Sequence, residues 1–232
     1  MRQVVKRIFK DQNFKELTVP FLKGEEGFFA VNTHENFINF YLVLFLDKIG
    51  DDFLEKYVPD YYYGIKSLEI GYDERMDKNL SLLICLNRET ELSELERNRE
   101  IFQVEEDPYF FKKYVFTYTK KQANELSEML QKHKTKSTKE IINNIINNKD
   151  DFIELKNHPQ KNTIYNLCSK LMIKIPFLIL ERGEEQMEDL EEGIKMELRK
   201  SGLLKYTSAL LELEEFDDIN NILQVFDDGG EE

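Results

Sequence analysis

Histidine and cysteine, the side chains most often used as metal ligands and nucleophiles, are few and scattered in this chain. The histidines are His34, His133 and His158, and the cysteines are Cys85 and Cys168. None has a second ligand at the short spacing that zinc sites use, so the sequence predicts no metal site and no cofactor. Both cysteines lie among apolar residues, which predicts buried free thiols and a cytoplasmic protein.

Acidic residues form two patterns that could serve metal-dependent chemistry. Pro59-Asp60 with Glu154-Leu155-Lys156 imitates the Asp and Glu-x-Lys of a nuclease, but such fragments arise by chance in a chain that is 33% charged. The segment 73–79 lacks the alternating ligands and the glycine of an EF-hand loop, so we expect a polar turn there. Phosphate-binding loops and a Gly-x-Ser-x-Gly elbow are absent from the sequence. No enzyme is predicted, although a triad assembled from distant residues stays open as an alternative.

Aromatic residues are the most distinctive feature of the chain. Six rings fall within the ten positions from Tyr109 to Tyr118. Rings at that density are costly to leave in water, so they belong to a core or to a contact surface. Lys112 and Lys113 interrupt them and would carry positive charge to the edge, a composition typical of interface hot spots. Besides a core strand, we therefore consider a partner-binding site made of Tyr109, Phe110, Phe111, Lys112, Lys113 and Tyr114.

The elements that would position these residues are strands and helices in alternation. Hydrophobic patterning predicts strands at 28–31, 37–46, 65–70, 80–86 and 114–118, with 37–46 in the centre of the sheet. Helical spacing predicts helices near 4–9, 51–58 and 119–130. Pro59 should end the second of these, and a capping box of Thr119 and Gln122 should begin the third. Asp107-Pro108 is typical of a helix start.

After the basic segment 132–139 the pattern becomes helical. Helices are expected at 141–146, 164–171, 187–198 and 219–226. The fold class is therefore α+β, with an N-terminal mixed sheet and helices followed by a mainly helical acidic C-terminal region. The predicted domains are an α+β body at 1–135, a helical region at 136–226 and a disordered acidic tail at 227–232.

The net charge of −13 is concentrated near the end of the chain. Residues 181–232 hold 17 acids and 5 bases, whereas residues 1–180 hold 28 acids and 27 bases. Such an acidic segment repels nucleic acid, so direct nucleic-acid binding through the C-terminal region is not expected. It is either a solvated face or a docking element for a basic partner. The longest apolar run, 41–46, is too short to cross a membrane.

Two segments together resemble a known family. Asp77-Lys78-Asn79-Leu80-Ser81-Leu82-Leu83-Ile84, followed by Glu105-Glu106-Asp107-Pro108-Tyr109-Phe110-Phe111-Lys112-Lys113-Tyr114-Val115, resembles the middle-component proteins of bacterial ABC-three-component systems. Lamassu-type antiphage systems are the best-known members. The resemblance covers roughly residues 28–130. It implies a non-catalytic adaptor between an SMC/Rad50-like ABC ATPase and an effector, often a nuclease, and assigns no role to individual residues.

The leading hypothesis is therefore an accessory subunit of an antiviral defence complex, which contacts the ATPase through apolar and aromatic surface on the body. The acidic C-terminal helices would restrain a basic effector. Two alternatives stay open. One is an acidic immunity-type inhibitor of a nuclease toxin, and the other is a hydrolase whose triad is not visible in the sequence.

Overall fold

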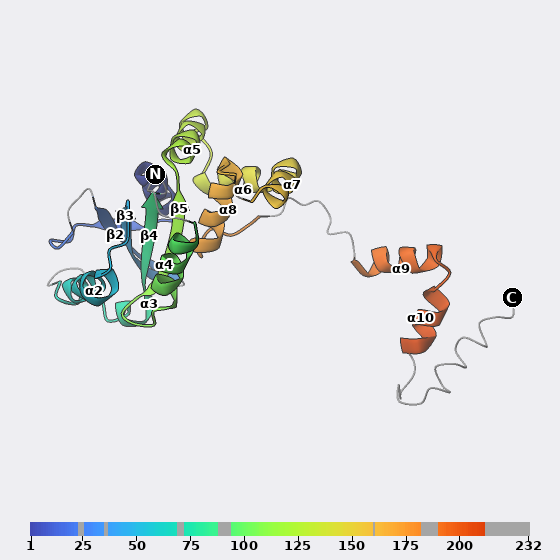
Figure 1. Cartoon of the computed structure of the whole chain (residues 1–232), viewed down its shortest axis with the longest axis horizontal. Coiled ribbons are helices and arrows are strands. Elements are labelled where there is room, and N and C mark those ends of the chain that lie inside the picture. Colours follow the sequence, from blue (N-terminus) through green and yellow to red (C-terminus); the bar gives the residue numbers. More distant parts are fainter. Residues whose placement is uncertain are drawn as a thin grey trace. The chain divides into compact units, whose positions relative to one another are not determined.

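The computed structural model describes residues 1–22, 26–34, 37–68, 72–87, 94–159, 161–181 and 190–211. The chain divides into two compact units, Met1–Glu181 and Arg182–Glu232. The first unit contains a five-stranded sheet covered by helices, which confirms the predicted α+β fold class (Figure 1). The second contains α9 (Leu190–Lys200) and α10 (Leu204–Leu211). The boundary predicted at 135 falls inside the first unit.

The strands follow one another in space in the order of the sequence. They are β1 (Lys15–Leu17), β2 (Gly27–His34), β3 (Phe37–Leu46), β4 (Leu80–Asn87) and β5 (Lys112–Tyr118). The first three strands are antiparallel, whereas β3, β4 and β5 run parallel. The predicted central position of β3 is confirmed. With paired strands on both edges and helices on both faces, β3 has the nearly continuous apolar sequence of a buried strand.

Alternate residues of strands β2 to β5 enter two separate cores. On one face, Tyr41, Val43 and Leu83 pack with α1 (Arg2–Asp11), α5 (Lys120–Lys132), α6 (Thr138–Ile146) and α8 (Ile164–Lys174). On the other face, Leu42 and Leu82 pack with the π-helical turn η1 (Phe53–Tyr57), α2 (Val58–Lys66), α3 (Met76–Asn79) and α4 (Glu94–Glu106). The remaining helix of this unit is α7 (Lys149–Asn157), whose Leu155 packs at the edge of the first core.

Side-chain caps join the helices of the first core. Thr119 and Gln122 form the predicted capping box at the start of α5. The Gln122 amide also donates to the Thr163 carbonyl at the start of α8, over 2.7 Å. Asp11 at the end of α1 accepts hydrogen bonds from the backbone N–H and the hydroxyl of Thr138, at 2.7 and 2.6 Å. These bonds connect the helices after residue 135 to those before it.

Two local predictions are wrong around Pro59. This proline does not end a helix, because the chain stays helical from the π-helical turn η1 into the first turn of α2, where Pro59 lies. The strand predicted at 65–70 is also wrong at its start, since Ile65 and Lys66 lie in α2. Ile65 and Leu68 are three residues apart, a spacing that suits one face of a helix as well as a strand.

Asp107-Pro108 also differs from its prediction. It follows the end of α4 and opens an irregular loop, 107–111, that leads directly into β5. The segment 73–79 contains the short helix α3 after a turn. Parts of some predictions lie outside the described residues, namely 69–70, 187–189, the helix at 219–226 and the tail at 227–232. No helix in the described ranges has both the length and the apolar character needed to span a bilayer.

Candidate partner-docking surface

The loop 107–111 closes over a buried lysine. The Lys113 side chain is fully buried, and its ammonium forms an ion pair with the Asp107 carboxylate at 2.6 Å. It also donates to the carbonyls of Asp107 at 3.0 Å and Tyr109 at 2.5 Å. A third carbonyl, that of Phe111, lies 3.3 Å away. The ammonium thus gathers three carbonyls and one carboxylate of the same loop, which fixes the loop's path around it.

Phe110, at the tip of this loop, has a backbone conformation that is unusual for its residue type. Its φ angle is 68°, in the left-handed region that a bulky side chain rarely occupies. Such a conformation costs on the order of 1–2 kcal/mol. The hydrogen bonds from Lys113 to the carbonyls on either side of Phe110 offset that cost. The consequence is that the Phe110 ring turns toward α2.

Four rings meet where the loop approaches α2. The Phe110 ring centroid lies 5.2 Å from that of Tyr62 and 5.9 Å from that of Tyr63. Tyr109 joins the cluster at 6.4 Å from Phe110, and Tyr62 lies 5.7 Å from Tyr63. We call the surface formed by Tyr62, Tyr63, Tyr109 and Phe110 the aromatic patch. The Phe111 ring lies beneath it, in edge contact with Tyr62 at 5.8 Å.

Much of the aromatic patch is open to solvent. Tyr109 is 65% exposed, Tyr63 is 61% exposed and Phe110 is 37% exposed. Large apolar rings that touch one another and remain exposed mark a binding surface more often than scattered single residues do. Tyrosine and phenylalanine also bury a large area while losing little side-chain entropy, which suits a contact with another protein.

The structure separates the six residues that the sequence analysis grouped. Tyr109 and Phe110 lie on the surface, whereas Phe111 and Lys113 are buried below them. The prediction that Lys113 carries charge to the edge is wrong, because the folded loop encloses its ammonium. Lys112 and Tyr114 alternate to the opposite side of the strand, where the Lys112 ammonium lies 5.5 Å from the Tyr114 ring.

Sequence reasoning missed the two tyrosines that α2 contributes to the patch. A signal was present in the run Tyr61-Tyr62-Tyr63, which is as dense in rings as any part of the chain. No element was predicted for this run, which lies between the helix expected at 51–58 and the strand expected at 65–70. Helical geometry places the Tyr61 ring near Phe21, at 6.3 Å, and leaves Tyr62 and Tyr63 facing the loop.

The two cysteines lie where their thiols are not reactive. Cys85 and Cys168 are buried free thiols, as predicted. Burial, with a smaller effect of Glu125, raises the pKa of Cys168 to about 12, and burial also raises the pKa of Cys85. Neither thiol is therefore activated as a nucleophile.

The nuclease-like fragments are not brought together. Asp60 lies on α2, which packs on one face of the sheet, and Glu154 lies on α7, beside the other core (Figure 1). Glu154 is instead paired with Lys161. In the segment 73–79, Asp73 is held by Arg75 at 2.5 Å and Asp77 by Lys66 at 2.6 Å. Within the described ranges, no group of three His, Cys, Asp or Glu side chains could hold a metal ion.

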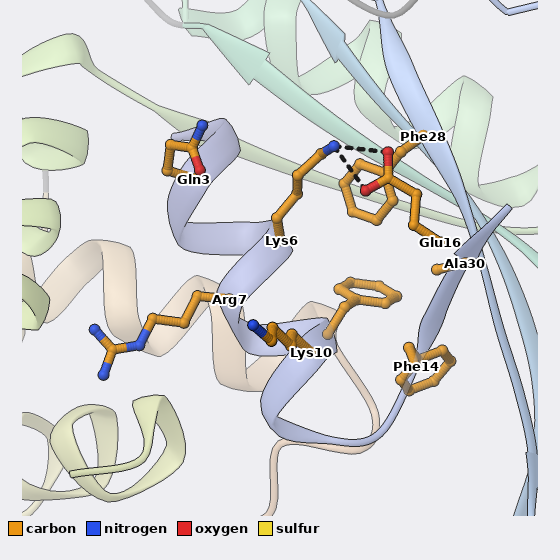
Figure 2. A pocket seen from close by; sticks show the side chains of 9 residues that line it. Gln3, Lys6, Arg7, Lys10, Phe14, Glu16, Phe28 and Ala30 are labelled. Atoms are coloured by element: carbon orange, nitrogen blue, oxygen red, sulfur yellow. Dashed lines mark hydrogen bonds and ion pairs between the residues drawn. The ribbon is translucent and has the colours of Figure 1, made fainter. Parts of the chain in front are cut away.

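A pocket of about 440 Å³ lies between α1 and the first two strands (Figure 2). Phe14 and Phe28 contribute to its apolar lining, and basic side chains of α1 stand at its rim. Lys6 points toward Glu16 and pairs with it at 2.6 Å, while Arg7 points away from the pocket (Figure 2). The pocket does not adjoin the aromatic patch, because it belongs to the α1 face of the sheet.

An exposed cluster of contacting rings is typical of a surface that binds another protein. The family model for the ABC-three component (ABC-3C) system Middle Component 1 matches residues 27–150, more than half of the chain. The chain therefore belongs to this family, which confirms the resemblance at the level of the family. No curated protein and no solved structure matches the chain. The matched residues run from β2 through α6 and contain the whole aromatic patch.

Proposed function

We propose that this chain is a non-catalytic accessory subunit that links an SMC/Rad50-like ABC ATPase to an effector, most simply a nuclease, in a Lamassu-type antiphage defence complex of the bacterial cytoplasm. Membership of a middle-component family supports a role inside a multi-component assembly. The aromatic patch is the observation that carries the protein contact, and we assign it to the ATPase.

The patch has the properties of an interface hot spot. Its four rings come from two segments, α2 and the loop 107–111. The buried Lys113 fixes the path of the loop, and ring contacts join the loop to α2. A partner that covers the patch would remove the exposed rings Tyr63 and Tyr109 from water without first ordering a flexible segment. Truncating one such ring in an interface typically costs about 2 kcal/mol or more, roughly a thirty-fold loss of affinity.

Co-purification with the proteins of the neighbouring genes tests this assignment. The double variant Tyr63→Ser and Tyr109→Ser removes two exposed rings and should retain its fold but lose the ATPase subunit. Phe152→Ser is a matched control, since Phe152 is 53% exposed on α7 and lies outside the patch. Undiminished co-purification of the double variant would refute the assignment, and a wild-type chain that always elutes alone would refute the subunit role.

The acidic C-terminal unit is proposed to restrain the effector. The excess of acids in this unit lies in 182–189 and 212–232, which together hold 13 acids and one base, whereas Glu191 and Glu197 of α9 pair with Lys195 and Lys200. Carboxylates of this kind attract a basic protein over a distance set by the salt concentration. Binding of the effector should weaken as salt rises and should be lost on truncation after Glu181. If the truncated chain instead loses protection against a single toxic nuclease, with no ATPase involved, the immunity-type alternative is favoured.

A further inference from the structure

Basic residues of the first unit are gathered in two short segments. Residues 1–16 hold five basic and two acidic residues, and residues 119–139 hold six basic and two acidic residues. The rest of 1–180 carries 16 bases and 24 acids. The near-neutral total therefore conceals a separation of charge, with the positive part confined to α1, α5 and the turn that follows α5.

The fold brings these two segments into contact. Arg7 of α1 donates to the carbonyls of Leu130 at 2.6 Å and Lys136 at 2.9 Å, which lie at the end of α5 and in the turn after it. Asp11, one turn later on α1, binds Thr138 at the start of α6. Figure 2 shows the Arg7 side chain extending from α1 away from Phe14 and Phe28. We call the joined surface the basic face; its members are Lys6, Arg7, Lys10, Lys132, Lys134 and Lys136.

Three lysines of the basic face are available to a ligand. Lys10, Lys132 and Lys134 have exposed side chains and form no ion pair among the described residues. The other members already have acceptors, since Lys6 pairs with Glu16 and Lys136 with Glu140. They still add positive charge to the surface, so an incoming anion meets a positive field around three uncommitted ammonium groups.

The basic face lacks the apolar anchors that a protein partner would use. The exposed large apolar side chains of the described residues include Tyr63, Phe102 and Tyr109, and none of them lies in 1–16 or 119–139. Protein interfaces obtain most of their affinity from such anchors. A nucleic-acid backbone needs none, because its affinity comes from neutralised phosphates and released counterions.

We propose that the basic face binds the phosphate backbone of double-stranded nucleic acid without reading its sequence. The proposal does not depend on the defence role or on the aromatic patch. It places nucleic-acid contact on the first unit, whereas the acidic C-terminal unit would oppose it. The lysines supply charge only, and the described residues of 1–16 and 119–139 include no exposed phenylalanine or tyrosine ring that could stack on a base, so duplexes of different sequence should bind alike.

The test measures binding of the full-length chain to a short fluorescent DNA duplex by anisotropy, between about 50 and about 200 mM salt. Affinity falls as salt rises, and each phosphate that the protein neutralises makes the plot of log affinity against log salt steeper by about 0.9. The triple variant Lys10→Ala, Lys132→Ala and Lys134→Ala should therefore give a plot that is less steep by about 2.7. The wild-type chain should then lose roughly 40-fold more affinity than the variant across this salt range.

A matched triple variant separates the basic face from charge in general. Lys48→Ala, Lys78→Ala and Lys156→Ala removes three exposed lysines outside the face and should change the slope little. Thermal unfolding confirms that both variants fold. The proposal is overturned by absence of duplex binding at the lowest salt, by an equal effect of the two triple variants, or by a polyglutamate competitor that displaces the wild-type chain as readily as unlabelled duplex does.

Discussion

Replacing Lys113 by methionine tests whether the buried ammonium holds the loop 107–111. The change keeps an unbranched side chain of similar length but removes the charge that meets the Asp107 carboxylate at 2.6 Å and the Tyr109 carbonyl at 2.5 Å. Removing one partner of a buried pair typically costs about 3–5 kcal/mol. Asp107 retains 22% exposure and can regain water, so we expect the lower end, about 3 kcal/mol.

Thermal unfolding followed by circular dichroism measures this loss. For a unit of this size, a loss of about 3 kcal/mol lowers the unfolding midpoint by roughly 6–12 °C. Lys112→Met is the control, because Lys112 precedes Lys113 in β5 but has an exposed side chain, and its effect should stay within about 0.5 kcal/mol. If the two variants unfold at the same temperature, the Lys113 ammonium does not hold the loop and the account of Phe110 fails with it.

Three further results are expected. Phe110→Gly relieves the positive φ but removes a ring of the aromatic patch, so the free energy of unfolding should change by less than about 1 kcal/mol while co-purification with the ATPase falls. A loss of stability as large as the loss of co-purification would contradict the assigned role. Because their pKa values are raised, Cys85 and Cys168 should react with a thiol reagent at pH 8 only after unfolding, and fast labelling of the native chain would contradict their burial. Asp11→Ala should lower the free energy of unfolding, measured by denaturant titration, by about 2 kcal/mol, because Thr138 loses both of its hydrogen bonds. Asp51→Ala, at an exposed position, is the control, and equal effects of the two variants would count against the connection between α1 and α6.

Local patterns predicted four of the five strands, β2 to β5, because the residues of each strand show which of its faces are buried, whereas the short edge strand β1 was not predicted. In β4, Leu82, Ile84 and Leu86 alternate with residues of the other core, and this alternation is visible without knowledge of the partner strands. The capping box of α5 was predictable for the same reason, since Thr119 and Gln122 are three residues apart. The position of β3 followed from its apolar residues on both faces.

The candidate surface was only half predictable, because it depends on contacts between distant segments. The rings after Asp107 are visible in the sequence, but whether Lys113 points outward depends on a loop that folds back over it. The contribution of Tyr62 and Tyr63 depends on the phase of α2, which continues through Pro59 from a π-helical turn. No short-range pattern fixes that phase, so a strand was predicted where the helix continues.

The two proposed surfaces lie on opposite faces of one sheet. Tyr62 and Phe111 pack with the core that contains Leu82, whereas α1 and α5 pack with the core that contains Leu83. Adjacent residues of a strand point in opposite directions, so β4 itself separates the surface built on α2 from the surface built on α1. A protein bound at the aromatic patch would therefore leave the basic face accessible. This arrangement suits a subunit that holds a protein partner and a nucleic acid at the same time.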